Sequence, residues 1–435
     1  MLMFHASCCC SLCLLSFLVS IKTSRPQACP QASGISFITF IIAALSPLSS
    51  LCVSGSIDIP LPWPSLILPL LTLPSYHLLL EHLPGTLTLG EAAIVCQGGL
   101  VLSALAIETL AKAPVLHFFI DDSFPLRSFL ILVPFWILAL AVSTWGIVSS
   151  KHHLITALSC TLLTLSVLAL SDLAAWVLFT FLILHHSVRR PLIIAYWTLL
   201  TALTLPLMNH ASKWIKGNNS RLALLRKGYH LLLLAIFLPI FLIDRDMLCV
   251  SASIAFAAMI LLEALRCSGL LPSNIRSSLQ AFMESFTDDR DSGPICTTHI
   301  SLLLGVSIPL WISLTTQLGL PDSALALSGL VCLGVGDTAA SVFGILWPGK
   351  KVRLFADSNK TLQGAVAGLM SMLLFWSWSG ILSPFHPSSH PIILATCGSA
   401  LLEASTHQID NLVLPLAFSA HLLLSHPIST PHQAS

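Results

Sequence analysis

The sequence predicts an all-α fold, a polytopic bundle of about 13–15 membrane-spanning helices, each with about 20 mostly apolar residues. The first observation is composition: 55% of the 435 residues are hydrophobic and only 9% are charged, whereas soluble proteins average about 25% charged residues. The second is a mean hydropathy of +0.88. The third is that long apolar segments recur along the whole chain. The formal net charge of +1 argues against a nucleic-acid partner, because such binding requires a strong basic excess.

Residues 1–208 are expected to form an N-terminal hydrophobic transmembrane scaffold. The apolar segment 2–21 precedes the basic residues Lys22 and Arg25, which favours a first membrane helix over a cleaved secretory signal, where basic residues come first. Prolines crowd residues 60–74, so the chain there is expected to be broken or re-entrant. Spans are expected near residues 2–21, 35–57, 62–80, 91–111, 125–148, 154–170, 173–188 and 191–208.

Residues 209–435 are expected to form a C-terminal transmembrane region that carries the chemistry in its cytoplasmic loops. The chain has 20 Lys and Arg and 19 Asp and Glu, and 16 of these 39 residues lie between positions 213 and 291, with five more between 350 and 360. The polar surface is therefore concentrated in this half. Spans are expected near residues 229–243, 247–265, 298–318, 322–346, 362–381, 391–406 and 411–425.

The order of these spans predicts that several polar segments share one face of the membrane. If the basic segment 213–227 is cytoplasmic, as the excess of basic residues favours, successive crossings return the long loop 266–297 and then the segments 350–360 and 403–410 to the same side. Arg189 and Arg190 conflict with this arrangement, because they fall on the opposite side if segment 191–208 crosses once.

The segment 334–344, GVGDTAASVFG, places an acidic residue inside an apolar stretch. An intramembrane carboxylate is costly and indicates a functional site. Asp337 and Ser341 are four residues apart and would share a helix face, with Thr338 beside them. The alternative is a packing face of small residues in which Asp337 pairs with a neighbouring helix.

The loop that follows carries cations directly before an expected helix. Lys350, Lys351 and Lys360 lie at the membrane edge, and Thr361 and Gly364 open the next apolar segment. A helix N-terminus offers free N–H groups and a positive dipole end, which suit phosphate. The alternative is an ordinary basic loop that only sets the topology.

Acidic residues follow in segment 401–412, LLEASTHQIDNL. Glu403 and Asp410 are seven residues apart, so on one continuous helix they would face the same way and could bind Mg²⁺. The alternative is a helix end followed by a polar cap at Asp410. Two weaker candidates are the basic pair Arg226 and Lys227 before an apolar segment, and an acidic turn with Asp288 and Asp291. The turn would either bind a divalent cation or simply be solvated.

Taken in order, five segments resemble the dolichol kinase family and, more distantly, membrane polyprenol kinases and CDP-diacylglycerol synthases. They are RKGYH, FTDDRDSGP leading into THISLLLGVSIPLWI, GVGDTAASVFG, WPGKK followed by NKTLQG, and LLEASTHQIDNLVLPL. The resemblance covers about residues 221–425, roughly half of the chain. One departure is Gln363, where the family pattern Lys-Thr-x-Glu-Gly has Glu, and another is a longer spacing between Lys351 and Lys360.

The resemblance implies a multi-pass enzyme of the endoplasmic reticulum membrane that transfers the γ-phosphate of CTP to the hydroxyl of dolichol. The products would be CDP and dolichyl phosphate, the lipid carrier for N-glycosylation and related mannosylation. It also implies that the loop containing Lys350, Lys351, Lys360, Thr361 and Gly364 binds the nucleotide. The expected partners are therefore CTP, a dolichol or polyprenol lipid, the bilayer and a divalent cation such as Mg²⁺.

The candidate site residues divide into three groups by expected role. Asp337, Glu403 and Asp410 are the candidate catalytic residues. Asp337, Asp410, Asp288 and Asp291 are the candidate metal ligands. The candidate nucleotide-binding residues are Thr338, Ser341, Lys350, Lys351, Lys360, Thr361, Gly364, Arg226 and Lys227.

Three other functions stay open from the sequence. A cytidylyltransferase like CDP-diacylglycerol synthase would use the same substrate nucleotide and metal, and a related kinase would act on a shorter prenol. A polytopic transporter is disfavoured, because its charges would line a pathway near the middle of the membrane, whereas here they gather at one interface.

Overall fold

The computed structural model describes part of the chain, and the account below concerns that part. The described residues are 76–77, 79–81, 86–87, 91–92, 94–96, 189–215, 219–268, 271–283, 295–315, 322–347, 349, 360–380, 389–405 and 410–425. They form helices and no β-strand, which confirms the all-α prediction for this part. The spans expected before residue 189 lie almost wholly outside the described residues, so the expected total of about 13–15 stays a prediction.

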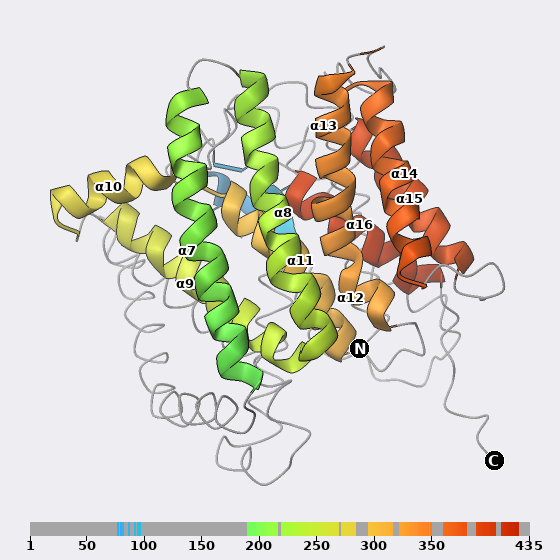
Figure 1. Cartoon of the computed structure of the whole chain (residues 1–435), viewed down its shortest axis with the longest axis horizontal. Coiled ribbons are helices and arrows are strands. Elements are labelled where there is room, and N and C mark those ends of the chain that lie inside the picture. The colour runs from blue at the N-terminus through green and yellow to red at the C-terminus, as the bar shows by residue number, and fades with distance from the viewer. Residues whose placement is uncertain are drawn as a thin grey trace, which may run out of the picture. The chain divides into compact units, whose positions relative to one another are not determined.

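The described helices, labelled in Figure 1, belong by their contacts to two compact units, each described by itself. One unit contains α7 (Arg189–Ile215), α8 (Asn219–Ile243), α9 (Arg245–Ser268), α10 (Ser273–Met283) and the first part of α11. The other contains the end of α11 (Thr298–Thr315), then α12 (Asp322–Leu330), the π-helix η2 (Val331–Asp337), α13 (Thr338–Leu346), α14 (Leu362–Trp378), α15 (Ser389–Ser405) and α16 (Asp410–Ser425).

Three of these helices are long and apolar enough to cross a membrane. They are Arg189–Met208, Arg221–Ile243 and the continuous run Ser323–Leu346, and shorter apolar helices cover Thr298–Ser313, Leu362–Trp378 and Asp410–Leu423. Each of the eight spans expected from residue 191 onward coincides with one or more of the described helices. The described part of the chain is a polytopic helical membrane bundle, as the composition predicted.

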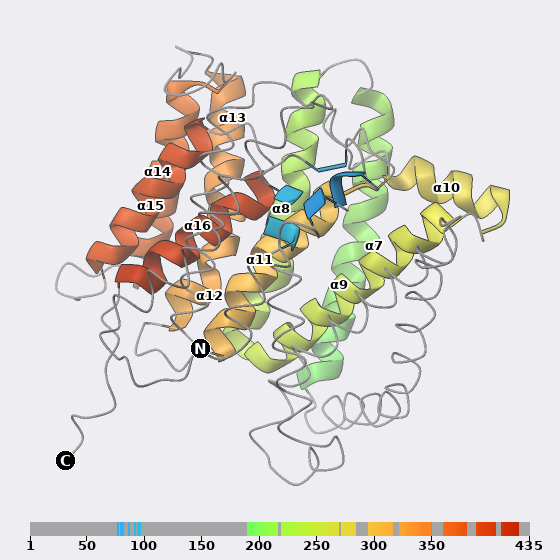
Figure 2. The ribbon, with the colours of Figure 1, turned by 180° about the vertical axis from the view of Figure 1, so that it is seen from behind.

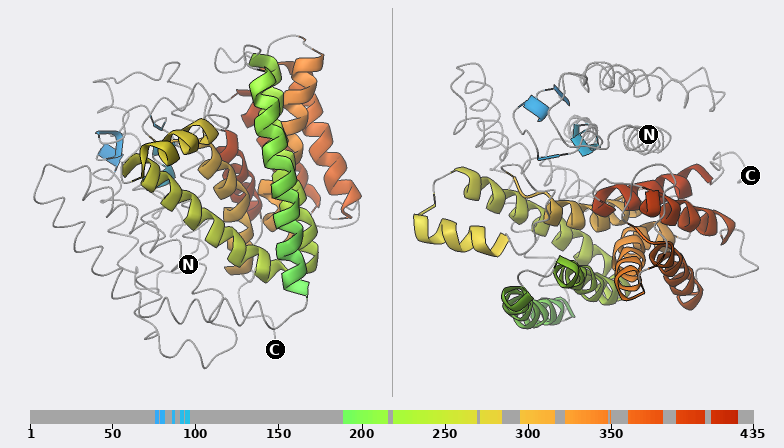
Figure 3. Two further views of the ribbon diagram at one scale, coloured as in Figure 1. Left: turned by 60° about the vertical axis from the view of Figure 1, so that its left-hand side comes forward. Right: turned by 90° about the horizontal axis from the view of Figure 1, so that it is seen from above.

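In the first unit, α7 and α8 run side by side (Figure 3). The outer side of α7 is strongly apolar, and Leu199 and Leu203 each expose more than half of their surface, as expected for a face covered by lipid. At one end of the pair, Arg190 Nε lies 2.8 Å from Asp244 Oδ2. Arg190 is one of the two arginines that conflicted with the expected topology. Asp244 compensates its charge at this position.

The loop expected at 266–297 contains a helix that the sequence analysis missed. Residues 273–283 form α10, which is too short and too polar to be recognised as a span. Arg266 connects it to α9: the guanidinium binds Glu263 at 2.6 Å and donates to Gln280 of α10 at 2.7 Å. Glu263 also accepts the N–H of Cys296 at 2.6 Å. These contacts satisfy a carboxylate that is otherwise buried.

In the second unit, α12, η2 and α13 form one continuous helical run against which α14 and α16 pack (Figure 2). Trp376 of α14 and Phe418 of α16 are fully buried and stack with ring centroids 5.8 Å apart. The hydroxyls of Ser328 and Ser419 lie 3.1 Å apart between α12 and α16. Aromatic stacking and a satisfied polar pair thus fix the helices that surround the π-helix.

Glycines allow α14 to approach η2 and α13 closely. A Cβ added at Gly364 would lie 2.6 Å from the carbonyl oxygen of Ala340, and one at Gly368 would lie 3.1 Å from that of Gly336. Gly364 and Gly368 form the GxxxG spacing that permits close helix crossing in membranes. The small residues noted in segment 334–344 therefore accommodate a neighbouring backbone.

Candidate active site

Three carboxylates converge in the second unit from three different helical segments. Asp337 is the last residue of η2, Glu403 lies near the end of α15, and Asp410 begins α16. One oxygen from each lies within 4.8 Å of the others. Asp337 and Glu403 are only 2% and 8% exposed, so their charges require compensation inside the protein.

Lys360 supplies part of that compensation. Its Nζ lies 2.5 Å from Oε1 of Glu403 and 2.8 Å from Oδ2 of Asp410. Burial by itself lowers the pKa of a lysine, but the carboxylates of Asp410 and Glu403 outweigh it, so the pKa of Lys360 lies above its usual value. The side chain is therefore an ammonium ion across the physiological pH range.

Glu403 and Asp410 lie close together, but not on one continuous helix: the structure has the alternative of a helix end followed by a new helix that begins at Asp410. The helix α15 ends at Ser405 and α16 begins at Asp410. A carboxylate is favoured in the first turn of a helix, because it faces the positive end of the helix dipole. Asp410 thus marks the start of α16. Lys360 bridges Glu403 and Asp410 across the break between α15 and α16.

The residue after Lys360 forms the N-cap of α14. Thr361 has an extended backbone, and its Oγ1 accepts the N–H of Gly364 at 3.2 Å. The predicted helix start at Thr361 and Gly364 is therefore present, directly beside the lysine that reaches the acidic cluster. A helix N-terminus next to an ammonium ion is an arrangement suited to phosphate.

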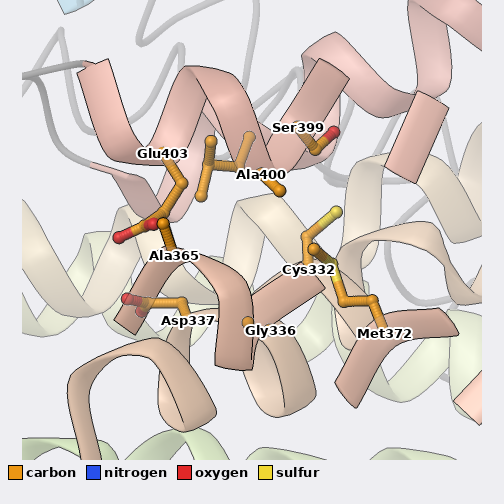
Figure 4. Close-up of a pocket in the computed structure, with 10 residues that line it drawn as sticks. Cys332, Gly336, Asp337, Ala365, Met372, Ser399, Ala400 and Glu403 are labelled. Atoms are coloured by element: carbon orange, nitrogen blue, oxygen red, sulfur yellow. The ribbon is translucent and has the colours of Figure 1, made fainter. Parts of the chain in front are cut away.

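The π-helical turn determines which side chains accompany Asp337. Its hydrogen bonds span five residues instead of four, which brings Cys332 onto the face of Asp337. Thr338 donates its hydroxyl to the carbonyl of Leu333, five residues back, at 3.2 Å. Cys332, Gly336 and Asp337 line a narrow pocket, which α14, α15 and α16 complete (Figure 4).

The remaining candidates from the sequence are distributed as follows. Thr338 is buried and engaged with its own helix, and Ser341 is partly exposed on α13. Arg226 and Lys227 lie partly buried in α8, in the other compact unit. Their roles stay predictions. Lys350, Lys351, Asp288 and Asp291 lie outside the described residues.

The cluster fits a divalent cation by its donor set. Three carboxylates against one ammonium leave a formal excess of negative charge. Oδ1 of Asp410 is buried and has no hydrogen-bond partner among the described residues. Carboxylate oxygens are the ligands that Mg²⁺ and Ca²⁺ prefer. An orphaned carboxylate oxygen within a group of three is therefore chemically appropriate for such an ion.

Two pocket residues, Cys332 and Ser399, were not singled out from the sequence. Ser399 is four residues before Glu403 on α15, so helical spacing places them on one face and could have indicated it. Cys332 could not have been found in this way, because five residues from Asp337 is the wrong spacing on an α-helix and only the π-helix corrects it.

The helices and the buried acidic site define a polytopic membrane protein with a charged centre beside a phosphate-compatible helix start. A family model for dolichol kinase matches residues 49–365. The chain therefore belongs to the dolichol kinase family. The matched range includes Asp337, Lys360 and the helix start at Thr361, and it ends before Glu403 and Asp410.

Curated relatives carry the same family name. The chain is similar to dolichol kinase of Homo sapiens, with 35% identity over 248 residues, covering 54% of this chain and 45% of that one. Dolichol kinase of Bos taurus is 31% identical over 375 residues, covering 78% and 65%. Dolichol kinase EVAN of Arabidopsis thaliana is 33% identical over 258 residues, covering 57% and 42%. The chain thus spans about half to two thirds of these relatives, and no solved structure matches it.

Proposed function

We propose that this chain transfers the γ-phosphate of CTP to the hydroxyl of dolichol, giving dolichyl phosphate and CDP, in the endoplasmic reticulum membrane. The observation that carries the proposal is the contact of Lys360 with Glu403 and Asp410, beside Asp337 and the start of α14. Membership of the dolichol kinase family supports the acceptor and the reaction type. The curated dolichol kinases that resemble the chain support them as well.

The chain's own residues would act mainly by positioning and by neutralising charge. Phosphoryl transfer has a loose transition state, so the protein needs to align the reactants and balance the charge of the phosphate oxygens. Lys360 and the N–H groups at the start of α14 would bind the triphosphate, with Lys350 and Lys351 contributing from the same loop. The lipid hydroxyl would come from the bilayer and CTP from the cytoplasm.

Asp337, Glu403 and Asp410 would hold a divalent cation such as Mg²⁺. When bound, this cation would neutralise charge on the phosphate oxygens that Lys360 also faces. Asp288 and Asp291 are further candidate ligands. Alternatively, Asp337 would act as the base that accepts the proton of the lipid hydroxyl, because its carboxylate lines the pocket beside the cluster.

The decisive experiment uses microsomes that express this chain, supplied with dolichol and with CTP labelled at either the γ- or the α-phosphate, with and without Mg²⁺. A kinase moves only the γ-label to lipid, and only when the cation is present. Transfer of the α-label would instead indicate a cytidylyltransferase like CDP-diacylglycerol synthase. Preference for farnesol or phytol in competition with dolichol would indicate a kinase for a shorter prenol. Lipid movement without CTP turnover would indicate a transporter.

A further inference from the structure

The pocket beside the acidic cluster has two chemically different ends (Figure 4). Asp337 and Glu403 lie at one end, as the labelled side chains show. Cys332, Ser399 and Met372 lie at the other. A group that enters this pocket therefore meets carboxylates on one side and a small hydroxyl and thiol on the other.

Ser399 differs from the other hydroxyl residues of its helix. Thr396 donates to the carbonyl of Ile392 at 2.6 Å, and Ser405 donates to that of Leu401 at 2.9 Å. Ser399 is 3% exposed, and its Oγ makes no such bond within the described part of the chain. The neighbouring Cys332 thiol is at most a weak partner. A buried hydroxyl without a full partner costs free energy unless a ligand or water satisfies it.

The size of the pocket limits what can satisfy this hydroxyl. The space beside Ser399 and Glu403 holds about one water-sized group. An isoprenoid chain is far too large, but the hydroxyl at the end of such a chain fits. Gly336, Ala365 and Ala400 keep the walls small between the two ends.

We propose that the Ser399 hydroxyl binds the hydroxyl group of the lipid alcohol acceptor and presents it to Asp337 and Glu403. The proposal rests on the proposed kinase function and names the residue that recognises the alcohol. Ser399 and Glu403 lie one helical turn apart on the same face of α15, so a hydroxyl bound between them lies next to the carboxylate cluster. The competing occupant is a structural water, which needs the same polar partners.

The test compares Ser399→Ala with Thr396→Val, a matched control on the same helix whose hydroxyl bonds only to its own backbone. Initial rates are measured in detergent micelles at varied mole fractions of dolichol and, separately, at varied CTP. Ser399→Ala is expected to raise the apparent KM for dolichol about three- to tenfold, the effect of losing one neutral hydrogen bond. The KM for CTP should stay unchanged. Thr396→Val should leave both values unchanged.

An unchanged dolichol KM in Ser399→Ala would overturn the proposal and assign the pocket to a water. An equal rise in the KM for dolichol and for CTP would also overturn it. If the alanine variant does not accumulate in the membrane, Ser399→Cys serves instead, because the weakly donating thiol should change the dolichol KM in the same direction. Failure of the Ser399 proposal is distinguishable from failure of the kinase proposal. In the second case the unmodified chain itself would show no γ-label transfer.

Discussion

At the scale of single residues, the site depends on how buried charges are compensated. The ammonium of Lys360 contacts Glu403 and Asp410 at 2.5 and 2.8 Å. Removing one partner of a buried ion pair leaves the other uncompensated, which costs about 3–5 kcal/mol. A neutral residue of the same shape keeps the packing but still removes one charge, so the activity of such a variant has to be compared with the amount of folded protein.

Asp337→Asn tests the proposed role of the π-helical carboxylate. The amide keeps the size of the side chain but neither accepts a proton nor binds a cation strongly. We expect γ-label transfer from CTP to dolichol to fall by at least about a hundredfold, while the amount of protein in the membrane stays the same. Asp246→Asn, at an exposed carboxylate of α9, is the control. Near-normal transfer in Asp337→Asn would exclude this residue from the reaction.

Asp410→Asn tests whether the orphaned oxygen Oδ1 is a cation ligand. Losing a charged ligand weakens cation binding, so the Mg²⁺ concentration for half-maximal activity should rise at least about tenfold. The binding of Mn²⁺ to purified protein, followed by electron paramagnetic resonance, should weaken in parallel. If both measurements matched those of the unmodified chain, the cation would have to bind elsewhere.

At the scale of helices, the site depends on the close crossing of α14 with η2 and α13. The π-helix turns Cys332 and Asp337 to one face, and the glycines of α14 let Lys360 and Thr361 start their helix near Gly344. A Cβ at Gly344 would lie 3.1 Å from Oγ1 of Thr361. The packing of these helices thus places the lysine at the acidic cluster.

Gly364→Ala tests this crossing, with Gly398→Ala as the matched control. The added methyl at Gly364 would collide with the backbone oxygen of Ala340 at 2.6 Å, whereas nothing lies within 4 Å of one at Gly398. We expect Gly364→Ala to destabilise the protein by about 1–3 kcal/mol and lower its thermal midpoint in detergent. Gly398→Ala should be neutral or stabilising by about 0.5–1 kcal/mol. Equal midpoints for the two variants would contradict the close approach.

At the scale of the whole molecule, the distribution of charge and aromatic residues along the helices indicates where the membrane lies. Trp347 follows α13 and is 59% exposed, and Trp378 ends α14 and is 80% exposed. Because α13 and α14 run antiparallel, these two residues mark opposite ends of the pair. Exposed tryptophans are typical of the two membrane interfaces. The loop that carries Lys360 lies at the Trp347 end.

Labelling of cysteines introduced one at a time, compared with the parent chain in sealed microsomes, tests this topology. Cysteines introduced by Lys350→Cys and Gln408→Cys should react with a membrane-impermeant maleimide added outside, above the background of the parent chain. One introduced by Trp378→Cys should react only after permeabilisation, because α14 crosses the bilayer. Labelling of positions 350 and 408 from opposite faces would separate the basic loop from the acidic cluster and remove the proposed site.

Much of the architecture could be read from local composition. The apolar segments, the helix start at Thr361 and the candidate role of Asp337 follow from properties of neighbouring residues. The break between spans 391–406 and 411–425 was also predicted, whereas the π-helix and the helix α10 could not be found in this way. They depend on packing between segments or on differences in helical geometry that composition does not reveal.

The sequence by itself determined that the protein is a helical membrane bundle, because apolar length and scarce charge leave a chain little alternative in lipid. It also determined which charged residues were unusual enough to be candidates. Only the tertiary structure decided that Lys360, Glu403 and Asp410 contact one another and that Cys332 and Ser399 share their pocket with Asp337. The physical reason is that these residues lie on separate helical segments, whose relative placement depends on close packing at small residues and on one π-helical turn.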